Sequence, residues 1–273
     1  MARTLRRPRQ PHRIKKTLHK AKPHIPAHKR MARACQCVGC PLQSAEESPF
    51  CPKHTRNGCP AGSPLSGYEP PYEPELWNVD KAIQYSHNCF AYATNYIDWQ
   101  KVEICRTTEG CNVGFHVPGL EKGHPKFGAK VKRAANYMTC SDVVARTKAS
   151  LRGVEVGFTD ACPPMMSKIA IVVDDKNDLH YYRQDSNGWW SHKPGGRPVT
   201  NLDAAGVRIY NPERCSRYYP KEDPNDTGLN YRHFCCFLAI PRGAAAAFIK
   251  LAGGRRRSQR LFKKKSLKRI TKK

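Results

Sequence analysis

The chain has 273 residues, of which 48 are lysine or arginine and 22 are aspartate or glutamate, and its formal net charge is +26. This length suggests one or two domains. No apolar stretch approaches the ~18 residues of a membrane-spanning helix, and the N-terminus lacks the apolar core of a secretory signal. We therefore expect neither a membrane span nor secretion by the usual route.

The excess positive charge is concentrated at the two ends of the chain. Residues 1–33 contain 12 lysines or arginines and no acidic residue, and residues 255–273 contain 11 and no acidic residue, whereas residues 34–254 carry 25 basic and 22 acidic residues. Blocks of like charge repel themselves and bury little apolar surface, so these segments are predicted to be extended tails that bind acidic surfaces. Phe262 is the only aromatic residue in them, so any nucleic-acid binding would be non-specific phosphate contact rather than base stacking.

A cysteine-rich segment, residues 34–60, follows the first tail. Cys37-x2-Cys40 is followed by Cys51-x2-His54, and two such ligand pairs are typical of a tetrahedral zinc knuckle. We predict a structural Zn²⁺ held by these four residues, because a segment this polar cannot form its own core. Cys35 and Cys59 are alternative ligands. The competing interpretation is free thiols, or disulfides in oxidising surroundings; for the thirteen cysteines as a whole, most are expected to be unpaired.

The remaining pattern predicts an α+β fold, an antiparallel sheet with packed helices. Residues 61–75 read as a Pro/Gly/Ser linker held on the surface by Tyr68 and Tyr72, residues 76–242 as the core domain, and residues 243–273 as a short helix and a basic tail. Helices are predicted from an N-cap at Asn88 and over 139–152, capped by Thr139 or Ser141. The predicted strands are Lys168–Val173 and His180–Asp185, which form a hairpin, Trp189–His192, and Phe234–Ile240.

One constellation suggests nucleophilic catalysis. Cys89 falls at the start of a predicted helix, where backbone N–H groups and the helix dipole favour a thiolate. His180 lies on a later strand, and His192 or Asn201 could orient its imidazole. This order is similar to that of papain-like hydrolases, including the branch of peptidoglycan-cleaving amidases, and it would make Cys89 the nucleophile and His180 the base. The simpler interpretation is that Cys89 is a small buried hydrophobe; His87 and His192 also compete as the base.

Several strings of residues occur together in an unusual combination. They are SHNCFAYA (86–93), CPPMMSKIAIVVDD (162–175), HYYRQDSNGWWSHKPG (180–195), PVTNLDAAG (198–206) and NYRHFCCFLAIP (230–241). Over about residues 66–241 this set resembles a family of mostly uncharacterised proteins of large double-stranded DNA viruses, such as algal and giant viruses. The resemblance implies a virion component, such as a minor capsid protein, made in the host cell cytoplasm.

The expected function is therefore structural. The tails 1–33 and 255–273 would bind other capsid proteins or an acidic inner surface of a virus particle. Two alternatives stay open at this point: a Cys–His hydrolase acting on an amide of a cell-wall polymer or protein, and a packaging protein that binds nucleic acid through its tails alone.

Overall fold

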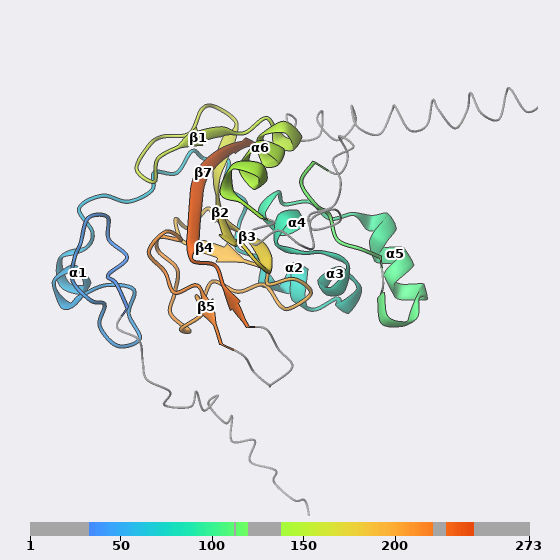
Figure 1. The fold of residues 1–273 in the computed structure, drawn as a ribbon, viewed down its shortest axis with the longest axis horizontal. Coiled ribbons are helices and arrows are strands. Elements are labelled where there is room, and N and C mark those ends of the chain that lie inside the picture. The colour runs from blue at the N-terminus through green and yellow to red at the C-terminus, as the bar shows by residue number, and fades with distance from the viewer. Residues whose placement is uncertain (1–32, 112, 120–137, 221–227, 243–273) are drawn as a thin grey trace, which may run out of the picture. The chain divides into compact units, whose positions relative to one another are not determined.

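The computed structural model of the chain describes residues 33–111, 113–119, 138–220 and 228–242 (Figure 1). The predicted tails, apart from Arg33, and the short helix expected after residue 242 lie outside the described residues. Within the described ranges no helix has both the length and the apolar character needed to cross a bilayer.

A five-stranded antiparallel sheet in the order β1-β7-β2-β3-β4 organises the chain (Figure 1). Its strands are β1 (Val154–Val156), β2 (Met166–Asp174), β3 (Asp178–Gln184), β4 (Trp190–His192) and β7 (His233–Pro241). β5 (Tyr218–Tyr219) and β6 (Leu229–Asn230) form a separate two-stranded ribbon. The predicted hairpin is confirmed, with Ile171 opposite Tyr181, and the two further predicted strands are present as β4 and β7.

The helices are short, and side chains of the sequence define where several begin. They are α1 (Pro52–Asn57), α2 (Pro74–Asn78), α3 (Lys81–Ser86), α4 (Cys89–Ala93), α5 (Trp99–Thr107) and α6 (Cys140–Leu151), with a 3₁₀ turn, η1, at Glu109–Cys111. The Asn88 side chain accepts a hydrogen bond from the Ala91 N–H at 3.2 Å, and that of Thr139 accepts one from Asp142 at 3.3 Å. Both predicted N-caps are thus confirmed, because each satisfies an otherwise unpaired backbone donor.

The two faces of the sheet are covered differently. On one face, α4 and α6 pack against alternate residues of the central strands, and the core there includes Phe90, Ile169 and Tyr181. On the other face, loops rather than helices cover a second core that includes Tyr182 and Trp190. Because successive side chains of a strand point to opposite faces, neighbouring residues of β3 belong to different cores. The chain is therefore a mixed α/β protein with an antiparallel sheet. This part of the predicted fold, an antiparallel sheet with packed helices, is confirmed.

The segment predicted to be a linker contains no helix or strand between residues 61 and 73, and it is hydrogen-bonded to the core domain at several points. Ser63 and Gln184 exchange two hydrogen bonds of 2.9 and 3.0 Å, and the Arg183 guanidinium donates to the Pro71 carbonyl at 2.8 Å. Tyr72 packs against the cluster around Trp77, whereas Tyr68 is exposed. Of the two tyrosines that the sequence suggested as anchors, Tyr72 therefore contacts the core and Tyr68 does not, and polar contacts also hold the segment.

Six of the thirteen cysteines form disulfide bonds. The pairs are Cys37–Cys59, Cys105–Cys111 and Cys140–Cys235. The other seven cysteines are free. The prediction that most cysteines are unpaired agrees with this count. The three bonds themselves were not predicted, because their members are 22, 6 and 95 residues apart and such spacings do not specify pairing.

Candidate metal centre

Three thiols and one imidazole converge in the cysteine-rich segment. The ligand atoms of Cys35, Cys40, Cys51 and His54, called here the Cys3His group, all lie within 4.8 Å of one another. His54 Nδ1 is 3.4 Å from the sulfur of Cys35 and 3.4 Å from that of Cys51, and the sulfurs of Cys40 and Cys51 are 4.0 Å apart. Three sulfur donors and one nitrogen donor at these separations could hold one metal ion.

The local fold explains why these four side chains meet. A tight turn carries Cys35 and Cys40: the N–H of Cys35 donates to the Leu42 carbonyl at 2.9 Å, and Gly39 has a φ of 70°, which glycine adopts readily. Cys51 is the N-cap of α1, so His54 stands one helical turn further on, on the same side. The N–H of Cys51 donates to the sulfur of Cys35 at 3.2 Å and joins the two halves.

The group differs by one residue from the predicted ligand set. Cys40, Cys51 and His54 are present as expected, but the fourth member is Cys35, and Cys37 instead forms a disulfide bond with Cys59. Cys37 is completely buried, as Cys35 is. Cys35 and Cys37 are two positions apart, so spacing alone allows either Cys37 or the alternative ligand, Cys35.

The environment of the thiols differs within the group. Burial raises the pKa of Cys35, and hydrogen bonds from backbone N–H groups only partly offset this effect. For Cys51 burial also acts to raise the pKa, but the backbone N–H of His54 and the neighbouring thiols outweigh it, so the pKa lies below the ordinary value. The first turn of α1 therefore favours the thiolate that a metal ion requires at this position.

The knuckle, residues 34–60, is fixed to the core domain by polar contacts with the loop that contains residues 208–214. The buried Gln36 side chain accepts hydrogen bonds from the N–H groups of Tyr210 and Asn211 at 2.6 and 3.0 Å. Arg214 donates to the carbonyls of Cys35 and Cys40, the first at 2.7 Å. Arg214 thus holds the backbone of two members of the Cys3His group and ties their position to the core.

The second candidate site, Cys89 with His180, is not assembled. Cys89 lies in the core on the helical face of the sheet, where its thiol donates to the Leu179 carbonyl at 3.9 Å. His180 packs on the opposite face, against Tyr182 and Tyr231. Burial raises the pKa of Cys89 to about 12, so its position at the start of α4 does not produce the expected thiolate.

His180 and His192 instead form a buried pair. His180 Nε2 lies 2.7 Å from His192 Nδ1, and His192 Nε2 lies 2.9 Å from the carbonyl of Leu202. A carbonyl only accepts, so His192 carries its proton on Nε2 and accepts from His180 through Nδ1. Burial lowers the pKa of both residues, that of His192 to about 4. The sequence identified both histidines, but their arrangement is that of a neutral structural pair.

Comparison with known proteins gives one informative similarity. No family model matches the chain, and no solved structure matches it. Insoluble matrix shell protein 1 of Ruditapes philippinarum is 33% identical over 150 residues, which span 54% of this chain and 80% of that protein. The chain belongs to the family of this shell protein. The family match does not test the viral resemblance, which stays a prediction from the sequence strings.

Proposed function

We propose that this chain is a non-catalytic structural protein of an insoluble protein assembly, with a structural Zn²⁺ in its Cys3His group. The observation that carries the proposal is that four protein side chains converge on one point in this group. Its three sulfurs belong to buried residues and its fourth donor is the imidazole of His54, so an ion bound there has a complete protein shell. Four protein ligands are typical of structural zinc, whereas catalytic zinc keeps one position for water or substrate.

The distances within the Cys3His group support zinc. A tetrahedral Zn²⁺ with ordinary bond lengths separates two sulfur ligands by about 3.8 Å and a sulfur from a nitrogen by about 3.6 Å. The corresponding distances are 4.0 Å between Cys40 and Cys51 and 3.4 Å from His54 to each of two sulfurs. When bound, the ion would supply folding energy to a knuckle that has little apolar core besides its cysteines and Phe50.

Among the residues that the structure describes, Cys89 and His180 are not arranged as a nucleophile and its base, which supports a role without catalysis. The thiol of Cys89 is protonated at neutral pH and faces the opposite side of the sheet from His180. The papain-like core and the hydrolase that the sequence suggested are therefore not our preferred proposal.

The family relation and the disulfide bonds support a matrix role. The related protein is named as an insoluble component of a shell matrix. Three disulfide bonds are typical of proteins that work in oxidising surroundings. A place in a virus particle, which is also an assembly of structural proteins, stays a prediction that only the sequence strings support.

The metal content of the purified full chain tests the proposal. We expect elemental mass spectrometry to find about one zinc per chain. The Cys40→Ser variant should contain no zinc and should unfold at a lower temperature. Cys162→Ser is the matched control, because Cys162 is a free cysteine outside the group. Wild-type protein that is folded but free of metal would refute the zinc. Rapid alkylation of Cys89 by iodoacetamide in the native state would refute the non-catalytic interpretation, because an activated thiolate reacts and a buried thiol does not.

A further inference from the structure

One edge of the sheet is left partly uncovered. β1 pairs with β7 only at Phe237–Ala239, while β2 pairs with β7 along nearly its whole length. After Val156 the chain turns away from the sheet, and the N–H of Gly157 donates to the Asp160 carboxylate at 2.7 Å. Within the described ranges, no strand pairs with the outer side of β7 from His233 to Cys236. Backbone donors and acceptors on such an edge are available to a further strand.

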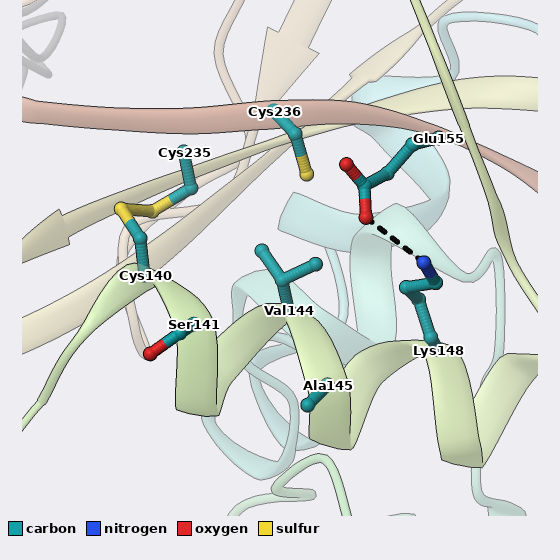
Figure 2. Close-up of a pocket in the computed structure, with 8 residues that line it drawn as sticks. All are labelled: Cys140, Ser141, Val144, Ala145, Lys148, Glu155, Cys235 and Cys236. Atoms are coloured by element: carbon teal, nitrogen blue, oxygen red, sulfur yellow. Dashed lines mark hydrogen bonds and ion pairs between the residues drawn. A yellow bond between two sulfur atoms is a disulfide. The ribbon is translucent and has the colours of Figure 1, made fainter.

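Two hollows flank this uncovered edge, one on each face of the sheet. A β-bulge interrupts β7 here, since Ile171 is opposite Cys236 and the next residue of β2 is opposite Phe234. The first hollow, of about 480 Å³, lies between α6 and β7, and Figure 2 shows Cys236 and Glu155 facing the side chains of the helix across it. The second, of about 380 Å³, lies on the other face, and the two share Glu155 and Cys236.

The second hollow combines an aromatic floor with negative charge. Its lining residues include three phenylalanines and three carboxylates, and they include no lysine or arginine: Phe158, Phe234, Phe237, Glu155, Asp160 and Glu213. Glu155 also forms an exposed ion pair with Lys148 at 2.9 Å across the first hollow (Figure 2). A strand edge flanked by side-chain hollows on both faces is the arrangement by which sheets bind extended peptides: main-chain bonds give affinity and the hollows accept alternate side chains.

We infer that this edge, called here the β7 groove, binds the basic C-terminal segment, residues 255–273, of a second copy of the chain. The inference rests on the proposed role in an assembly and names the contact that would build it. The segment carries 11 lysines or arginines and no acidic residue, so its charge complements the carboxylates of the groove. It also contains Leu261, Phe262, Leu267 and Ile270, which can occupy an aromatic floor.

The other basic tail is a poorer occupant. Residues 1–33 contain prolines at 8, 11, 23 and 26, and proline has no N–H to donate to a strand edge, whereas residues 255–273 contain no proline. A tail that docks on the groove of the next copy makes a head-to-tail contact, and such contacts produce extended assemblies where successive copies do not close into a ring. This geometry suits a protein whose relative is named as insoluble.

Sedimentation of the nuclease-treated full chain tests the contact. At about 0.1 M salt we expect species heavier than the 30.9 kDa monomer that dissociate at about 0.5 M salt, because screening weakens charge attraction. The double variant Glu155→Lys, Glu213→Lys should weaken association by at least about tenfold. Both residues are exposed, so the fold should survive. The control, Glu73→Lys, Glu109→Lys, makes the same change of charge on exposed residues outside the groove and should associate like the wild type.

A photo-crosslinker in place of Phe262, in a mixture of ¹⁵N-labelled and unlabelled chains, identifies the occupant. We expect crosslinks to Phe234 or Phe237 that join labelled to unlabelled chains. Crosslinks confined to single chains would show that the segment folds back on its own groove and would overturn the inference, as would crosslinks elsewhere or equal weakening by the control variant. Zinc content and protection of Cys89, measured on the same sample, report on the proposed function separately: if they hold while the wild type stays monomeric, only the groove contact fails.

Discussion

The buried histidines make the folded state sensitive to mild acid. His192 Nδ1 must be unprotonated to accept the hydrogen bond from His180. A proton on Nδ1 would instead face the N–H of His180 Nε2. His87 has the same constraint, because its Nε2 accepts the backbone N–H of Asp98 at 2.8 Å. Burial lowers the pKa of His87 to about 4 and that of His192 to about 4. In the unfolded chain, by contrast, a histidine has a pKa of about 6.5.

The sign and size of the effect follow from these values. Between pH 7 and pH 5.5 the unfolded chain takes up protons on these side chains and the native state does not, so the free energy of unfolding falls as pH falls. Each residue with a native pKa of about 4 contributes a loss of about 1 kcal/mol over this interval, so His87 and His192 together contribute about 2 to 3 kcal/mol. His180, whose pKa is also lowered, adds to the loss. Above about pH 7 the contribution is constant.

Urea unfolding at constant ionic strength, followed by tryptophan fluorescence, measures this dependence. The native pKa values of Asp178 and Asp203 are raised by burial, which acts in the opposite direction, so the decisive quantity is a difference between variants. His192→Gln should lower the loss between pH 7 and pH 5.5 by about 1 kcal/mol, whatever it does to stability at pH 7. His87→Gln should do the same independently. Equal losses in the wild type and both variants would refute the assignment of neutral, buried histidines.

Three further predictions concern stability, each measured by urea unfolding at pH 7.5. Cys140→Ser should cost about 4 kcal/mol, because the bond from Cys140 to Cys235 closes a loop of 95 residues; an unchanged midpoint would mean that the bond is absent. Arg183→Lys should cost about 3 kcal/mol, because lysine cannot reproduce the planar contacts of the buried guanidinium with Asp185 and three other acceptors. An unchanged stability of this variant would mean that only the positive charge matters. Asn88→Ala should cost about 1 kcal/mol through loss of the N-cap of α4, and a change below 0.3 kcal/mol would contradict that role.

The strands and helix starts were predictable because their causes are local. Apolar runs identified β2 and β7, and the turn after β2 identified β3 as the second strand of a hairpin. Side chains with capping chemistry identified the starts of α4 and α6. β1 was missed because it has three residues and an exposed outer side, so it carries no apolar pattern. β1 is recognisable as a strand only by its pairing with β7, so it cannot be predicted until the position of β7 in the sheet is known.

The candidate sites were predictable as residue types but not as contacts. Residues Cys40, Cys51 and His54 follow a ligand spacing, and the structure brings them together. Cys89 and His180 were connected by chain order alone, which contains no information on the face of the sheet to which each side chain points. Alternate residues of β3 point to opposite faces of the sheet. A difference of one position in the strand therefore decides whether a histidine faces Cys89 as a catalytic partner or lies in the other core.

The Cys3His group and the neighbouring disulfide divide the cysteines of this segment between them. Five cysteines lie between residues 35 and 59, and random pairing among them would give several incompatible loops. An ion held by Cys35, Cys40 and Cys51 would withdraw three of these thiols from oxidation, since a coordinated thiolate is not free to attack a disulfide. Cys37 and Cys59 are then the pair that remains in this segment, and they are the pair that is bonded. One short segment thus contains both a disulfide bond and three thiols that are placed to act as ligands.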